Sequence, residues 1–213
     1  MIPGVGQVRL QLVGGPVARL TVGGSHSHED RGNVLLEVDG EEILVDRGIG
    51  GYSSATGGLL KRAVAHNLLV PNMPDGTPAR QKLDYTKGII PEATYENGVF
   101  RVEIDTTAAW PEHVQLCRRV VVSPSPEVFE ITDELHLAEE VGATLHLQTP
   151  CGVEQEGNSW SLGCDGVRVL VEPQWDVMEG RLTVEDFGAG EYGQAYGHLQ
   201  LPVAPAKVHH LVT

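Results

Sequence analysis

The sequence predicts an all-β protein, built as a large antiparallel sandwich of two sheets with very little helix. Apolar and polar residues alternate with a period of two in segments such as QVRLQLVG (7–14) and GVFRVEID (98–105). This alternation is typical of strands with one buried face. Gly, Pro, Asn and Asp interrupt it about every ten residues, and such frequent turns favour an antiparallel sandwich over a parallel sheet.

The predicted strands follow one another along the whole chain, and two pairs of them form tight hairpins. Asp39-Gly40 joins NVLLEV to EEILVD, and Asp165-Gly166 joins SWSLGC to GVRVLVEP. Asp-Gly is a favoured two-residue turn. Further strands are expected at 17–22, 114–122, 128–137, 143–150 and 206–213. Residues 71–97, rich in Pro and Gly, are expected to form a long loop. We find no repeat or linker and expect one domain over 1–213.

Charge and hydropathy exclude several classes of partner. The net charge of −14 lies entirely in residues 91–213, because residues 1–90 hold equal numbers of acidic and basic side chains. The acidic half should repel nucleic acid and anionic membranes, whereas the neutral half could receive a polyanion. The chain contains neither a membrane-spanning apolar run nor a signal peptide at its start. The sequence leaves the compartment open: cytoplasmic, or periplasmic or secreted if the chain belongs to a longer protein.

The cysteines do not indicate a disulfide framework. The chain has three, Cys117, Cys151 and Cys164, without CxxC spacing. Buried thiols or a single bridge are expected.

A group of histidines and one aspartate predicts a metal site. His26 and His28 are two residues apart, so in an extended segment both side chains project from one face. Asp46 ends the second strand of the 33–46 hairpin, which should bring it back beside His28. His66, followed by Asn67, could complete the set from a neighbouring strand. Two imidazoles and a carboxylate suit one zinc ion per chain, with a fourth position open.

These motifs resemble a known family. HSHEDRGN (26–33), LVDRGIGGY (44–52) and AHN (65–67) are similar to the pattern HxHxDxG, DxGxxxY and AHN of the C-terminal domain in heparinase II/III and alginate lyases. Looser similarity continues through CRRVVVSPSPEVFEITDELHL (117–137), TLHLQTPCGVE (144–154) and EYGQAYG (191–197). The resemblance therefore spans nearly the whole chain and is most specific between residues 23 and 67.

The resemblance implies a role for each matching residue. His28, Asp46 and His66 correspond to zinc ligands, and His26 and Tyr52 to acid/base groups facing the substrate cleft. Two further residues are candidate substrate contacts: Arg62 for a carboxylate or sulfate, and Asn67, which also shapes the strand end. Asp30 and Gly32 are expected to form the turn after HxH.

The resemblance also implies an activity and a partner. Family members cleave uronate-containing polysaccharides by β-elimination, using a helical toroid domain that neutralises the uronate carboxylate. No such domain precedes this chain's strands, so we expect an anionic polysaccharide as ligand, a toroid domain or chain as partner, and little activity from this chain alone.

Three other kinds of protein share part of this pattern. A cupin-type metal enzyme would need a Glu a few residues after HxH, and Glu37 is too far. A metallo-β-lactamase-like hydrolase would need a second His where Arg31 stands. A non-catalytic carbohydrate-binding or interaction module on the same sandwich remains open, because fold does not dictate function.

Overall fold

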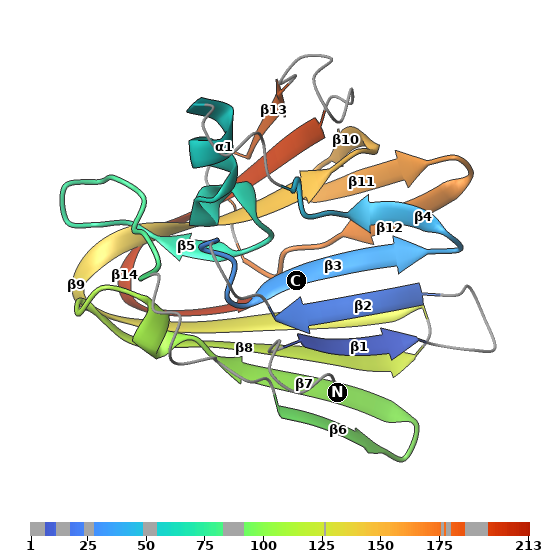
Figure 1. Ribbon diagram of the computed structural model, residues 1–213, viewed down its shortest axis with the longest axis horizontal. Coiled ribbons are helices and arrows are strands. Elements are labelled where there is room, and N and C mark those ends of the chain that lie inside the picture. The colour runs from blue at the N-terminus through green and yellow to red at the C-terminus, as the bar shows by residue number, and fades with distance from the viewer. Residues whose placement is uncertain are drawn as a thin grey trace.

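The all-β architecture predicted from the sequence is confirmed in a computed structural model of the chain (Figure 1). Its sheets are antiparallel throughout and pack on one another through a shared apolar core. The residues that the structure describes are 7–11, 18–23, 28–48, 55–82, 92–125, 127–175, 177, 180–185 and 196–213.

The strands form three sheets. The first has the order β1 (Gln7–Gln11), β2 (Ala18–Gly23), β3 (Asn33–Val38), β4 (Glu41–Leu44). The second has the order β13 (Arg181–Glu185), β14 (Tyr196–Val212), β9 (Val128–Thr149), β8 (Val114–Ser125), β7 (Val99–Asp105), β6 (Glu92–Glu96), with β5 (Leu69–Pro71) paired to β9. The third has the order β10 (Gly152–Glu156), β11 (Ser159–Cys164), β12 (Val167–Val171).

Helical structure within the described residues is short. It consists of α1 (Ala55–Leu60), η1 (Ala63–Ala65) and η2 (Thr107–Ala109). None of these described helices is long and apolar enough to cross a membrane. Helices α1 and η1 matter because they lie in the connection between β4 and β5, which also contains two of the three candidate metal ligands, Asp46 and His66.

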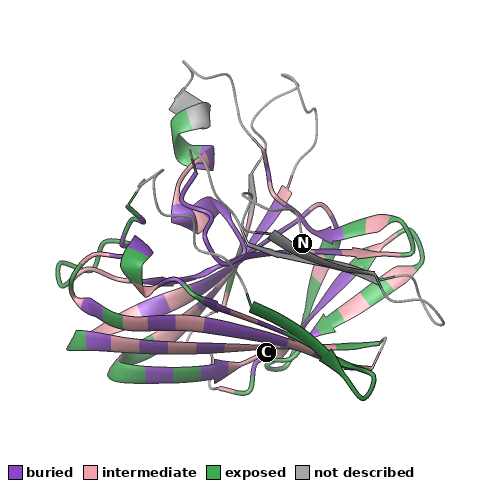
Figure 2. Cartoon of the chain, turned by 60° about the horizontal axis from the view of Figure 1, so that its bottom comes forward, coloured by how far each residue is buried: buried purple, intermediate pink, exposed green. Residues whose placement is uncertain are grey.

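The core forms where the inward faces of the sheets meet. Ile43 of β4, Leu135 and Leu145 of β9 and Leu199 of β14 are all nearly fully buried in one cluster. Buried and exposed residues alternate along the strands of the largest sheet, whereas β6 is exposed throughout (Figure 2). The alternation read from the sequence therefore corresponds to real inward and outward faces.

Both predicted hairpin turns are confirmed. Asp39 and Gly40 have φ angles of 51° and 91°, and Asp165 and Gly166 have φ angles of 37° and 90°. Positive φ at both central residues is what a two-residue type I′ turn requires, and it matches the twist of the flanking strands. The first turn matters for the site, because it returns the chain from β3 to β4.

The structure corrects the prediction in two places. The expected loop over 71–97 contains strand β6, which pairs with β7 across an Asn97-Gly98 turn. Its sequence, EATYE, alternates over only five residues, and all of them are exposed. The strands expected at 128–137 and 143–150 form one continuous strand, β9. Strand β14 pairs with it at Val141, inside the predicted break, and at Ala143. Strands β10 and β13 were not predicted.

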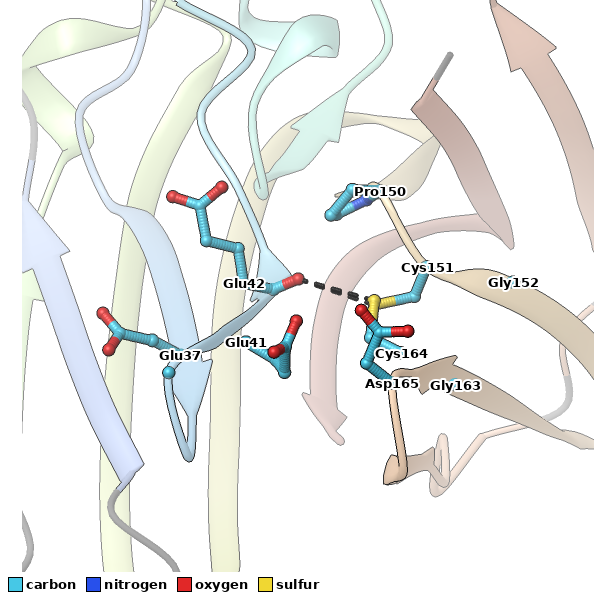
Figure 3. A pocket seen from close by; sticks show the side chains of 10 residues that line it. Glu37, Glu41, Glu42, Pro150, Cys151, Gly152, Gly163, Cys164 and Asp165 are labelled. Carbon is cyan, nitrogen blue, oxygen red and sulfur yellow. Dashed lines mark hydrogen bonds between the residues drawn. A yellow bond between two sulfur atoms is a disulfide. The ribbon is translucent and has the colours of Figure 1, made fainter. Parts of the chain in front are cut away.

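One disulfide and one buried thiol account for the cysteines. The Cys151–Cys164 disulfide closes the β10–β11 hairpin, and Cys117 is a buried free thiol. The Cys151 sulfur lies 3.5 Å from the carbonyl oxygen of Glu42, on β4 (Figure 3). The disulfide therefore cross-links the β10–β11 hairpin of the third sheet at the point where it contacts β4 of the first sheet. A polar cavity of about 600 Å³ lies beside it.

Candidate metal site

Three of the sequence-predicted side chains lie together. His28, Asp46 and His66 each offer one ligand atom, and these atoms all lie within 4.8 Å of one another. The imidazole rings of His28 and His66 have centroids 5.5 Å apart, and Nδ1 of His66 is 3.4 Å from Oδ2 of Asp46. The residues come from three separate segments: the turn before β3, the end of β4 and the end of η1.

The hairpin of β3 and β4 positions Asp46. Its two ends meet at the side chains of Asn33 and Asp46, where Asn33 Nδ2 donates to Asp46 Oδ2 at 3.3 Å. The other oxygen, Oδ1, accepts the backbone N–H of Gly48 at 2.9 Å. The expectation that the hairpin returns Asp46 to the neighbourhood of His28 is therefore confirmed.

A buried glutamate holds the segment that carries His66. The backbone N–H of Glu29 donates to the carbonyl of Lys61 at 2.8 Å, and its carboxylate accepts the N–H of Ala63 at 3.1 Å. The same carboxylate accepts two hydrogen bonds from Arg80. Because Glu29 adjoins His28 in sequence, these hydrogen bonds hold the segment that carries His28 against the segment that carries His66.

The turn after HxH uses the residues that the sequence suggested. Gly32 has a φ of 89°, which a side chain would strain, and Asn33 N–H donates to the backbone carbonyl of Asp30 at 3.0 Å. The turn thus depends on the backbone of Asp30 and not on its carboxylate.

His66 is chemically suited to a metal ion. Its side chain is 0% exposed, and neither ring nitrogen has a hydrogen-bond partner among the described residues. The Asp46 contact of 3.4 Å is too long to count as a good hydrogen bond. Buried polar atoms are normally paired, so this imidazole requires a partner of another kind. Two imidazoles and a carboxylate are a usual donor set for zinc, and the residues fit that group.

The pKa values of the two carboxyl groups near His66 are shifted in opposite directions. Burial raises the pKa of Asp46, but the contact with His66 and the hydrogen bond from Gly48 outweigh it, and the pKa lies below its ordinary value. For Asp30 burial prevails over the influence of His66 and raises the pKa to about 6. Asp46 is therefore a carboxylate at neutral pH without needing a metal to ionise it.

The remaining predicted residues have different positions. His26 and Tyr52 lie outside the described residues. Arg62 is half-buried at the start of η1, and its Nε has no hydrogen-bond partner in the described part of the chain, so a substrate contact stays a prediction. Asn67 is 1% exposed and its amide is bonded to backbone atoms, so we do not propose it as a substrate contact.

Asn67 instead joins three segments behind the site. Its Nδ2 donates to the carbonyls of Val34 and Val45, at 2.8 and 3.0 Å, and its Oδ1 accepts the N–H of Gln148 at 2.6 Å. One amide thus connects β3, the end of β4 and β9, directly after the candidate ligand His66.

A buried ion pair beneath the site was not predicted. Arg119 of β8 and Asp133 of β9 face each other across the ladder and form a two-point contact at 2.7 and 2.8 Å. Arg119 Nη1 also donates to the carbonyls of Gly32 and Asn67, at 2.9 and 2.6 Å. A sequence signal existed: Arg119 is in phase with the buried Cys117 and Val121, and a charge on an inward face demands a partner.

The fold and the site together define an antiparallel β-sandwich that carries a cluster of two buried histidines and one half-buried aspartate. The family model described as heparinase II/III-like, C-terminal, matches residues 4–191. The chain belongs to this family, which confirms the resemblance seen in the motifs. Among curated proteins, none matches by sequence.

Solved structures agree with the fold. One heparinase III superposes over 97% of this chain with a TM-score of 0.76 and 15% identity. Another covers 98% with a TM-score of 0.72 and 12% identity. A mutant heparan sulfate lyase from Pedobacter heparinus covers 98% with a TM-score of 0.70 and 13% identity. The matches cover 34%, 35% and 34% of those chains, so this chain spans about a third of their length.

Proposed function

We propose that this chain is the zinc-binding β-sandwich domain of a polysaccharide lyase that acts on a uronate-containing anionic polysaccharide. Its membership of the heparinase II/III-like C-terminal family supports the lyase assignment. The similar structures are named heparinase III and heparan sulfate lyase, which favours a glycosaminoglycan as the polymer. Because the chain spans about a third of those proteins, we propose that a helical toroid domain completes the cleft.

The observation that carries the metal proposal is the chemical state of His66. His66 is fully buried, and neither of its ring nitrogens has a hydrogen-bond partner among the described residues. Its ligand atom lies within 4.8 Å of those of a second imidazole and an ionised carboxylate. We propose that His28, Asp46 and His66 hold one zinc ion. These three side chains would hold the ion and so fix the segments that follow β4 and η1, and zinc, when bound, would supply positive charge to the site.

The proposed reaction is β-elimination, which breaks the glycosidic bond beside a uronate without water. A base removes the C5 proton, and an acid protonates the leaving oxygen. We assign these proton transfers on the sandwich side to His26 and Tyr52. Arg62, whose Nε is without a partner in the described residues, would contact a carboxylate or sulfate of the polymer.

Metal content tests the site directly. We expect about one zinc per chain, by plasma mass spectrometry, in protein purified without chelator, and none in His66→Ala or Asp46→Asn. The matched control is His136→Ala, which removes a half-exposed imidazole bonded to Glu134 and should keep its zinc. Folded wild-type protein without zinc, or full zinc in both site variants, contradicts the proposal.

Lyase activity tests the need for a second domain. We expect this chain alone to release unsaturated uronate from heparan sulfate or alginate at close to the background rate, because the groups that neutralise the uronate carboxylate are proposed to lie in the toroid. Ultraviolet absorbance of the unsaturated product measures the rate, with a complete heparinase III as positive control. Robust product formation by this chain alone would show that the sandwich contains a complete active site.

A further inference from the structure

The most unusual side chain beside the candidate ligands is Asp30. It is 9% exposed, and its Oδ1 is buried without a hydrogen-bond partner among the described residues. The backbone of Asp30 is held in the turn before β3, two residues after His28, so the carboxylate has a defined position. Leaving a buried carboxylate oxygen unpaired is costly, and a native protein keeps such a group where something else satisfies it.

The carboxylate of Asp30 lies within electrostatic reach of the candidate metal site. Asp30 interacts electrostatically with His66 and Asp46, and more weakly with Arg31. The guanidinium of Arg31 donates to the carbonyl of Lys82 at 2.6 Å, so it is directed toward another segment. The strongest electrostatic neighbours of Asp30 are thus two of the three candidate ligands.

The net charge of the proposed metal site also favours a role for Asp30. Two neutral imidazoles and the Asp46 carboxylate would leave one positive charge of a bound divalent cation uncompensated at a largely buried site. A second carboxylate would bring the site to neutrality, which favours a buried ion because unbalanced charge is costly away from water. Asp30 is not among the three side chains whose ligand atoms lie within 4.8 Å of one another. Asp30 is therefore suited to act on the metal ion through its charge and not as a direct ligand.

We infer that Asp30 is the second carboxylate of the metal site, an outer residue that balances the charge of the divalent cation and so strengthens its binding by His28, Asp46 and His66. This inference rests on the proposed function, because it presupposes that those residues hold a metal. It separates Asp30 from its neighbour Glu29, which is even more deeply buried but whose carboxylate is hydrogen-bonded by Arg80 and Ala63.

Zinc affinity and metal-free stability together test the inference. We expect Asp30→Asn to weaken zinc binding by about 10- to 100-fold, the usual loss when an outer residue of a metal site is removed. The dissociation constant is measured by competition with a chromophoric chelator on metal-free protein. The urea midpoint of metal-free Asp30→Asn should be no lower than that of the wild type, because the substitution keeps the shape and removes an unpaired charge.

The matched control is Glu29→Gln, which breaks a satisfied carboxylate next in sequence and should lower the metal-free urea midpoint. If wild-type protein and Asp30→Asn bind zinc equally well, Asp30 has no part in the site, while the metal site itself stands. If metal-free Asp30→Asn is destabilised as much as Glu29→Gln, or does not fold, its role is structural and the inference is overturned. If the wild type binds no zinc, the proposed metal site fails and the inference with it.

Discussion

Replacing Arg119 with methionine is expected to lower the free energy of unfolding by about 3–5 kcal/mol, the usual effect of removing one partner of a buried ion pair. Asp133 would keep its charge with side-chain exposure of 10% and lose both hydrogen bonds from the guanidinium. The carbonyls of Gly32 and Asn67 would lose the donor that they share. Urea unfolding followed by tryptophan fluorescence measures the change.

The neighbouring arginine provides a control on the same strand. Arg118 pairs with Glu134 in the next position of the same ladder, but its side chain is 42% exposed. Arg118→Met should therefore cost only about 0–1 kcal/mol, as exposed ion pairs do. The double variant Arg119→Met with Asp133→Leu should recover part of the loss, because it removes the stranded charge. Equal effects of Arg119→Met and Arg118→Met would refute this account of the pair.

Asn67→Asp is expected to lower the free energy of unfolding by about 2–6 kcal/mol, because each of two buried carbonyls left without a donor costs about 1–3 kcal/mol. The substitution preserves shape, but it turns an oxygen toward the carbonyls of Val34 and Val45, which now accept hydrogen bonds from Nδ2. Burial should raise the pKa of the introduced carboxyl in the folded state. The stability deficit should therefore shrink as the pH falls through that pKa, because protonation removes the charge and restores one donor.

The control for this change is an exposed amide with similar bonds. Asn158 Nδ2 donates to the carbonyls of Pro173 and Trp175, but the residue is exposed. Asn158→Asp should cost about 1 kcal/mol or less, since water can replace the lost donor. Urea titrations at several pH values compare the two variants. A loss in Asn67→Asp that matched Asn158→Asp and did not vary with pH would show that burial is not the cause.

Much of the site could be predicted because its parts are close in sequence or joined by a short hairpin. The Asp39-Gly40 turn fixes the register of β3 and β4, and this is enough to bring Asp46 near His28. His66 was placed by the motif alone, and the structure brings it to the same point through η1. The functional roles of these three residues, and those of His26, Tyr52 and Arg62, stay predictions.

The residues that sequence reasoning missed or misjudged depend on contacts between distant segments. Asn67 was a candidate substrate contact, but its amide is hydrogen-bonded to backbone atoms as distant as Val34, 33 residues before it, and Gln148, 81 residues after it. Asp30 was expected to shape a turn through its position in the motif, and only the three-dimensional structure shows that its Oδ1 is buried without a hydrogen-bond partner among the described residues.

The sequence by itself determined the class of fold, the hairpins and the pattern of the metal-binding motif. It could do so because strand alternation, Asp-Gly turns and HxH spacing are local properties, set by backbone geometry over a few residues. Tertiary structure alone decided that β9 runs unbroken, that β6 forms without a buried face, and that Arg119 and Asp133 pair beneath the site. The physical reason is that strand pairing and the cost of burying a charged group depend on which distant residues come into contact. The sequence of one strand does not specify the strand that will lie beside it.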